Sequence, residues 1–161
     1  MPMWSPGRAS SRGVTLIEMM TVVAIIGIMA GLFFPAVNAG LQSVRMVSAA
    51  DSIATFLNSA LNRAERRQDV IEIAISVKEN AIRLASSEPG FERRLDMPEG
   101  VRIAGVLPAL DESVDPRTFI IQPGGTPPRV GVEIANERGA RRIVRVDPMT
   151  GVPRIEVPES K

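Results

Sequence analysis

The pattern of hydrophobic and polar residues begins with a long apolar run. Residues 14–37 hold a single charged side chain, Glu18, in 24 positions. A helix of that length can cross a hydrocarbon core of ~30 Å at a rise of ~1.5 Å per residue. Arg8 and Arg12 precede the run, and basic residues beside a span favour the cytoplasmic side. The pattern therefore predicts a membrane-spanning helix with its amino end in the cytoplasm.

From residue 39 to about residue 67 the pattern stays helical but becomes amphipathic. Proline is absent between Pro35 and Gln68, and apolar residues recur every three or four positions: Leu41, Val44, Val47, Ala50, Ile53 or Ala54, Leu57, Leu61 and Ala64. We therefore expect one helix from about residue 15 to about residue 67, roughly 80 Å long. Its second half should form one wall of a globular domain.

After Gln68 the period changes to two, which is typical of β-strands. Ile71, Ile73, Ile75 and Val77 alternate with other residues, and glycine, proline and asparagine mark the turns that follow. The expected strands cover residues 70–77, 81–86, 101–104, 118–122, 129–135, 142–146 and 154–157, with a loop over 107–117. The fold class expected is α+β: a long amino-terminal helix packed against an antiparallel β-sheet domain.

Composition and charge restrict the possible functions. The 161 residues include no cysteine and no histidine, so the sequence offers neither thiolate ligands nor the commonest general base. Removing Arg8, Arg12 and Glu18 from the 19 basic and 18 acidic residues leaves 17 of each. We expect no catalytic residues, no cofactor and no metal site. A neutral domain also argues against nucleic acid as the main partner.

Two charged clusters are candidate binding sites. Asp111, Glu112 and Asp115 could coordinate a hard cation, but a solvated acidic loop is the preferred interpretation. Arg138, Arg141, Arg142, Arg145 and Arg154 form the one local basic excess, which we interpret as an exposed arginine-rich hairpin. If Arg142 begins a strand, Arg145 points to the opposite face, so the cluster does not automatically form one patch.

Glu18 is the unusual residue of the apolar run. A carboxylate inside the apolar region of a membrane costs several kcal/mol unless it is paired or neutralised. An acid in the first turn also favours the positive end of the helix macrodipole. We expect this helix-start effect to contribute, with a functional pairing as the main role.

The segment Arg12-Gly13-Val14-Thr15-Leu16-Ile17-Glu18 resembles the amino-terminal signal of type IV pilins and type II secretion pseudopilins. That signal is a glycine, a hydrophobic residue, Thr, Leu, a hydrophobic residue and Glu, followed by an apolar helix. Thr15, Leu16 and Ile17 therefore belong to the signal motif. Val14 is a departure, because the first mature residue of the family is most often Phe or Met.

The resemblance implies a role for several of these residues. A prepilin peptidase would cut after Gly13, and Val14 would become the N-methylated amino terminus. Glu18 would pair with the amino terminus of a neighbouring subunit and so set the register of assembly. Pro35 falls where pilin helices commonly carry a kink, and proline removes a backbone hydrogen bond there.

The carboxy-terminal half is similar to the GspH/FimT pseudopilin domain. The similarity rests on the segments 119–125, 136–139 and 147–151, which place a strand ending in Pro-x-Gly before a hairpin and a final strand. Major pseudopilins bind calcium near the carboxy terminus through clustered acids. Here Asp147, Glu156 and Glu159 are too scattered to propose such a site.

These resemblances imply a domain organisation. Residues 1–13 would be a cleaved cytoplasmic leader and residues 14–37 a transmembrane or filament-core helix. Residues 38–161 would be a periplasmic pilin-like α+β domain, helical to about residue 67. The protein would be a single-pass protein of the bacterial inner membrane, with its amino terminus cytoplasmic before cleavage.

The function expected is that of a structural minor pseudopilin of a type II secretion system. Its partners would be the prepilin peptidase, other major and minor pseudopilins, the inner membrane and the secretion platform. The alternative is a FimT-like minor type IV pilin involved in pilus assembly or DNA uptake, and DNA binding would require a basic exposed surface. A membrane-anchored enzyme is the third class, which the absence of His, Cys and any nucleophile motif disfavours.

Overall fold

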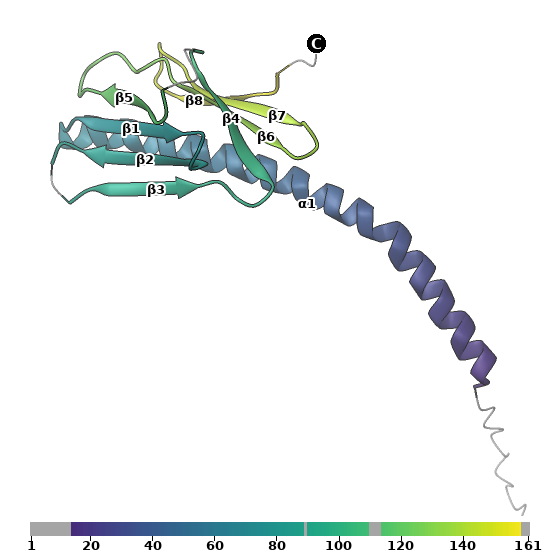
Figure 1. The fold of residues 1–161 in the computed structure, drawn as a ribbon. Helices are drawn as coiled ribbons and strands as arrows, with labels where there is room; N and C mark the ends of the chain where they lie inside the picture. Colours follow the sequence, from purple (N-terminus) through teal and green to yellow (C-terminus); the bar gives the residue numbers. More distant parts are fainter. Residues whose placement is uncertain (1–13, 89, 110–113, 159–161) are drawn as a thin grey trace, which may run out of the picture. The chain divides into compact units, whose positions relative to one another are not determined.

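The structure, a computed structural model, describes residues 14–88, 90–109 and 114–158. It contains one long helix, α1 (Leu16–Arg67), followed by eight strands (Figure 1). The strands are β1 (Ile71–Ser76), β2 (Ala81–Ser86), β3 (Glu92–Asp96), β4 (Val101–Leu107), β5 (Arg117–Ile121), β6 (Gly131–Asn136), β7 (Arg141–Val146) and β8 (Pro153–Glu156). The α+β class and the single long helix are confirmed. The chain divides into two compact units, residues 1–39 and 40–161.

In the second unit the strands form two sheets. The first has the order β3-β2-β1-β5 and the second the order β4-β6-β7-β8, and every pairing is antiparallel. The chain changes sheet three times, after β3, after β4 and after β5. The last of these connections holds Pro123, Pro127 and Pro128, which have no N–H to donate to a ladder. The expected antiparallel β-sheet domain thus consists of two sheets.

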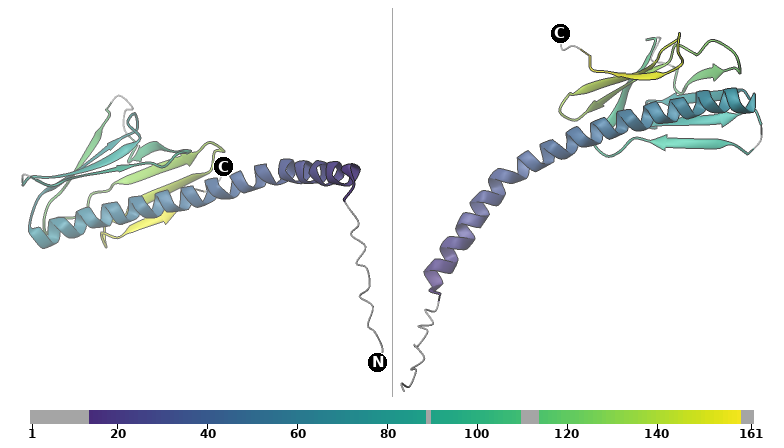
Figure 2. Two further views of the ribbon diagram at one scale, coloured as in Figure 1. Left: turned by 90° about the horizontal axis from the view of Figure 1, so that it is seen from below. Right: turned by 180° about the vertical axis from the view of Figure 1, so that it is seen from behind.

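The core lies between the second part of α1 and the two sheets (Figure 2). The helix contributes a buried stripe: Met46, Ala49, Ala50, Ile53, Leu57, Ala60 and Ala64. The sheets contribute a buried face each: Ile71, Ile73, Ile75, Ile82, Leu84 and Ile121 from the first, and Val101, Ile103, Val106, Val132, Ile134, Val144 and Val146 from the second. Both sheets and the helix thus share one hydrophobic core.

The prediction of which helix residues face the core was wrong for the first part of the amphipathic segment. Leu41, Val44 and Val47 are exposed, although they continue the three-residue spacing that reaches Ala50. Three residues at ~100° per residue turn ~300°, which is ~60° short of a full turn. Side chains spaced three apart therefore drift ~60° round the helix with every step. Val44 consequently lies ~160° round the helix from Met46, where the buried stripe begins.

Strand β3 was not predicted. Its sequence, ERRLD, has no apolar alternation, and only Leu95 packs against the core. It pairs with β2 alone and is the edge of its sheet, where charged side chains are common because they discourage further pairing. Just before it, the Arg63 guanidinium of α1 lies 3.7 Å from the centre of the Phe91 ring. This contact holds the start of β3 near the helix.

The other strands agree with the predicted ones to within a few residues at their ends. Strand β4 runs three residues beyond its predicted end, because a register shift between Ile103 and Gly105 lets it continue. This irregularity brings Val106 to the buried face alongside Val101 and Ile103. The glycines expected in the last two turns, Gly139 and Gly151, have positive φ angles of 81° and 70°.

Two polar side chains join the sheets. Asn80, in the β1–β2 turn, accepts a hydrogen bond from the Ile103 N–H at 2.8 Å and donates to the Val101 carbonyl at 3.0 Å. Arg117 on β5 donates to the Val106 and Pro108 carbonyls at 2.8 and 2.6 Å. Both contacts run from the first sheet to β4 or the residue just after it.

Replacing Asn80 with glycine should measure the first of these contacts. Asn80 has a φ of 53°, which glycine adopts without strain, so Asn80→Gly removes the two hydrogen bonds without a backbone penalty. The loss of partly buried bonds should cost ~1–3 kcal/mol and lower the Tm of the full-length protein, followed by circular dichroism in detergent.

Gln68→Gly is the matched control. Gln68 also has a φ of 53°, just after the end of α1, where the Asp69 N–H donates to the Ala64 carbonyl. Glycine is favoured at this position after a helix, so the Tm should stay the same or rise. Equal losses of stability in the two variants would mean that the Asn80 side chain does not join the sheets.

Candidate functional site

The candidate site is the start of α1. Gly13 lies outside the described residues, and Val14 and Thr15 immediately precede the helix, which begins at Leu16. The Glu18 N–H lies 3.3 Å from the Thr15 hydroxyl oxygen and 3.1 Å from the Thr15 carbonyl oxygen. A threonine that caps the helix with a glutamate three residues later is the sequence pattern of a capping box. Thr15 and Glu18 therefore help to determine where the helix starts.

Glu18 has no counter-charge within the described part of the chain. Its side chain is exposed, and none of the ion pairs between described residues includes it. Next to it, the Thr21 hydroxyl donates to the Ile17 carbonyl at 2.8 Å, so that neighbouring polar group is satisfied within the helix. An ionised Glu18 in an apolar environment requires a cation from outside this first turn.

The apolar half of α1 is uncovered. The window Leu16–Phe33 has a mean hydropathy of 2.3, and none of it is buried within the protein. By length and composition it can cross a membrane. Large apolar side chains are exposed along it, including Leu16 and Ile17 of the signal motif. Because so long an apolar surface is unfavourable in water, lipid or other protein chains must cover it.

Pro35 lies inside α1, which is helical on both sides of it. The Pro35 nitrogen cannot donate to the helix ladder, so one backbone bond is missing there. The kink expected at Pro35 stays a prediction.

The acidic loop divides between described and undescribed residues. Asp111 and Glu112 lie outside the described residues. Asp115 accepts hydrogen bonds from the Val77 N–H at 2.8 Å, the Ser76 hydroxyl at 3.1 Å and the Lys78 N–H at 3.3 Å. This carboxylate therefore closes the β1–β2 turn. Among the residues that the structure describes, no group of three or more acids could hold a metal ion.

Asp147 has a similar role in the β7–β8 turn. It accepts hydrogen bonds from the Met149 and Thr150 N–H groups at 2.8 and 3.3 Å and pairs with Arg154 at 3.1 Å. Glu159, the last of the scattered tail acids, lies outside the described residues. The position of Asp147 is that of a turn-forming residue.

The arginine-rich hairpin presents its charges on two faces, as expected. Residues 142, 144 and 146 of β7 share one face, where Val144 and Val146 are buried. Arg141 and Arg145 lie on the other face and are exposed. Arg141 pairs with Glu133 at 2.8 Å, so part of the basic excess is neutralised within the sheet.

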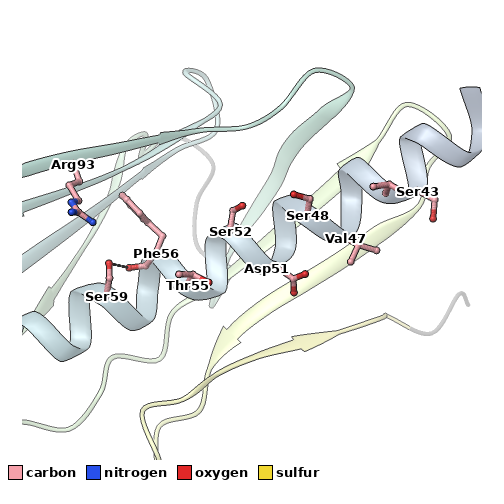
Figure 3. A pocket seen from close by; sticks show the side chains of 10 residues that line it. Ser43, Val47, Ser48, Asp51, Ser52, Thr55, Phe56, Ser59 and Arg93 are labelled. Atoms are coloured by element: carbon pink, nitrogen blue, oxygen red, sulfur yellow. Dashed lines mark hydrogen bonds between the residues drawn. The ribbon is translucent and has the colours of Figure 1, made fainter.

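A groove that the sequence did not predict lies along the exposed side of α1. It has a volume of about 650 Å³, and half of its lining residues are small hydroxyl side chains of the helix, with Arg93 of β3 at one end (Figure 3). The lining residues are Ser43, Val44, Val47, Ser48, Asp51, Ser52, Thr55, Phe56, Ser59 and Arg93. The exposed Val44 and Val47, assigned to the core from the sequence, contribute to its apolar part together with Phe56.

Comparison with known proteins gives two matches. Residues 8–34 match the family described as the prokaryotic N-terminal methylation motif. The fold is similar to that of the minor pseudopilin EpsH from the Type 2 Secretion System of Vibrio cholerae. That match has a TM-score of 0.55 and 12% sequence identity, and it covers 72% of this chain and 99% of the EpsH chain. No protein with a curated description matches the sequence.

The chain thus combines a methylation motif of the prepilin type with a pilin-like α+β fold. The motif match identifies the amino-terminal segment, and the similarity to EpsH concerns the fold.

Asp115 should make the stability of the second unit depend on pH. Burial alone would raise the pKa of Asp115, but the bonds from Val77, Ser76 and Lys78 outweigh it and hold the pKa below its ordinary value. A depressed carboxyl pKa stabilises the fold above the unfolded pKa, near ~3.9, and this stabilisation is lost as the pH falls through the folded pKa. Asp115→Asn should therefore lower the Tm by a few degrees at pH 7, with the difference from wild type shrinking below about pH 4.

Asp51→Asn is the control for this experiment. Asp51 is exposed on α1 and forms no ion pair with a described residue, so its replacement should leave the Tm almost unchanged at both pH values. A Tm difference for Asp115→Asn that stays constant from pH 7 to pH 3 would show that the charge of Asp115 does not stabilise the turn.

Proposed function

We propose that the protein is a minor pseudopilin of a type II secretion system, a structural subunit of the inner-membrane-anchored pseudopilus that drives protein export across the outer membrane. The observation that carries this proposal is the order of parts in one chain. A methylation motif leads directly into an exposed apolar helix, and that helix continues into a domain with the fold of a minor pseudopilin.

In this proposal residues 1–13 are a cytoplasmic leader and residues 14–37 are the membrane and filament-core helix. Residues 38–161 form the periplasmic domain. The basic leader supports this topology, because Arg8 and Arg12 lie on the side where positive charge is retained. Prepilin peptidase would cut after Gly13, and Val14 would become the N-methylated terminus. The Thr15 cap would survive that cut, since its contacts are to Glu18 and Met19.

During assembly the environment of the apolar helix would change from lipid to protein. Lipid covers Leu16–Phe33 in the membrane, and the helices of major and minor pseudopilins cover it in the filament. Glu18 would pair with the amino terminus of a neighbour's Val14. In a bundle of low dielectric constant this attraction is stronger than in water, so it would favour one axial register. Pro35 would allow the helix to bend near the membrane surface.

A secretion role is preferred to DNA uptake because of charge. The chain outside the leader and Glu18 is neutral, and two arginines of the basic cluster, Arg141 and Arg154, are paired with acids. Binding of a polyanion depends on cations that are free to replace its counterions.

Cleavage tests the signal. The mature protein purified from membranes should begin at Val14 when its mass is measured, and Gly13→Ala or a bulkier residue should leave uncleaved precursor. Gly27→Ala is the matched control: no atom lies within 4 Å of a Cβ added there, so processing should be normal. A chain that still begins at Met1 in a strain with active peptidase would rule out the pseudopilin proposal.

Glu18→Gln tests the pairing. Loss of a helix-start acid alone should cost ~0.3–1 kcal/mol. Loss of one charge from a buried pair leaves the neighbour's amino terminus uncompensated and should cost ~3–5 kcal/mol at each contact. Cleavage should survive, because the cut is set mainly by Gly13. We therefore expect a processed, membrane-inserted subunit that crosslinks poorly to partner pseudopilins.

Thr15→Ala separates this effect from helix capping. It removes the hydroxyl that caps the helix but keeps the carboxylate, so crosslinking should stay near the wild-type level. If Glu18→Gln crosslinks as well as wild type, the carboxylate does not guide assembly. If the two variants lose crosslinking equally, the role of Glu18 is that of a cap.

A further inference from the structure

Strand β8 is the last strand of the second sheet. In the order β4-β6-β7-β8 it pairs with β7 on one side, and no described strand pairs with the other side (Figure 1). An unpaired edge presents a row of backbone N–H and C=O groups that can bind another strand. The hydrogen bonds of the neighbouring turns determine which backbone groups point outward at this edge.

The strand β7 alternates between its two neighbours. The Val146 N–H donates to the Val130 carbonyl, on the side of β6, at 2.9 Å. The Asp147 N–H donates to the Val152 carbonyl, on the side of β8, at 3.1 Å. Because antiparallel ladders alternate, even-numbered residues of β7 bond to β6 and odd-numbered ones bond to β8.

The same alternation fixes the outer edge of β8. Arg154 and Glu156 lie opposite the odd-numbered residues Arg145 and Ile143, so their backbone groups bond to β7. Ile155 therefore directs both its N–H and its C=O away from the sheet. The Pro153 carbonyl and the Val157 N–H flank it on the same edge, and no described residue forms a hydrogen bond with these groups.

We propose that the partner of this edge is a second copy of the chain. The two β8 strands run antiparallel, with Ile155 of one copy opposite Ile155 of the other. The second sheets of the two copies then join into one continuous sheet related by a two-fold axis. This association is independent of the proposed role in secretion.

The backbone fits this register. Each Ile155 exchanges both of its hydrogen bonds with its counterpart, and each Val157 N–H donates to the opposite Pro153 carbonyl. Pro153 lacks an N–H, which weakens the edge for strands in general. In the self-paired register its free carbonyl is the group that is used.

Side-chain charge selects the same register. With Ile155 opposite Ile155, Arg154 of each copy lies directly opposite Glu156 of the other. A shift of two residues in one direction places Arg154 opposite Arg154, and a shift in the other direction places Glu156 opposite Glu156. Opposite charges across an antiparallel pair are stabilising and like charges are destabilising, so the centred register is favoured.

Other charged side chains on the face that carries Arg154 and Glu156 add to this charge complementarity. Arg145 lies directly opposite Arg154 within one copy, and Glu133 lies in the row that leads through β7 to Glu156. Pairing aligns the basic row of one copy with the acidic row of the other. Arg154 already contacts Asp147 at 3.1 Å but keeps two-thirds of its side chain exposed, so it can also receive Glu156 of the second copy.

The opposite face supplies apolar contact. Ile155 is 37% exposed and Val157 is 68% exposed. In the paired sheet the two Ile155 side chains become neighbours, and each Val157 lies across from Pro153. These contacts remove apolar surface from water, which favours association.

Cysteine crosslinking tests the register directly. The chain has no cysteine, so a single introduced residue reports one position. In full-length protein purified in detergent, Ile155→Cys should form a disulfide-linked dimer under mild oxidation, because the two Cα atoms of such a pair are ~5.5 Å apart. Val157→Cys is the matched control. It lies four residues from its counterpart, ~13 Å along the strand, and should crosslink poorly although it is more exposed.

A charge exchange tests the selectivity. In the Ile155→Cys protein, Glu156→Arg places like charges opposite each other and should raise the protein concentration needed for half crosslinking about tenfold. The double variant Arg154→Gln/Glu156→Arg removes the opposed like charges without placing a second carboxylate beside Asp147, and it should recover crosslinking. Glu137→Arg, in the β6–β7 turn, changes net charge equally and should have little effect. Unchanged Tm values exclude unfolding as the cause.

Three results would overturn the proposal. The first is equal crosslinking at positions 155 and 157. The second is a double variant that crosslinks no better than Glu156→Arg. The third is a crosslink from position 155 to a different protein in membranes while the purified chain forms no dimer, which would assign this edge to another partner.

Discussion

The first half of α1 has an apolar surface that the globular domain does not bury. Along Leu16–Phe33 no part of the helix is buried, whereas residues such as Ala50, Ile53 and Leu57 are fully enclosed. One continuous backbone thus carries two surfaces that need different environments. The globular domain satisfies the later surface from within the chain. The earlier surface is long and apolar, so covering it with lipid or with other helices would be favourable.

The edge strands of the two sheets differ in their side-chain contacts and charge. Arg117 and Asn80 join the first sheet to β4 with side-chain hydrogen bonds. At the other end of the first sheet, β3 carries charges along most of its length. At the other end of the second sheet, β8 carries one arginine and one glutamate with Ile155 between them. Mixed charge of this kind discourages most strands but fits an inverted copy of itself, which is how a short edge can be both soluble and selective.

The sequence predicted what depends on local pattern. The continuation of α1 to Arg67 follows from the absence of proline between Pro35 and Gln68, and the hairpins follow from alternation and turn glycines. It could not predict β3, whose residues ERRLD have no period because an edge strand needs little apolar surface. It could not predict two sheets either, because the partner of β5 is β1, far away in sequence. At the candidate site the sequence showed the motif from Gly13 to Glu18, while the contact between the Thr15 hydroxyl and the Glu18 N–H is seen only in the structure.

Electrostatics at the start of α1 connects this geometry to the proposed mature subunit. Cleavage after Gly13 would place a positive amino group beside the helix amino end, which already carries positive partial charge. Glu18 lies within the first turn and is the one acidic residue of the apolar run. In a lone subunit this cation and anion would both be held at the edge of the hydrocarbon, where each is costly. In a bundle of identical ends, every amino group can meet a carboxylate of the next chain. The two charges that are unfavourable in the isolated helix would therefore favour its assembly.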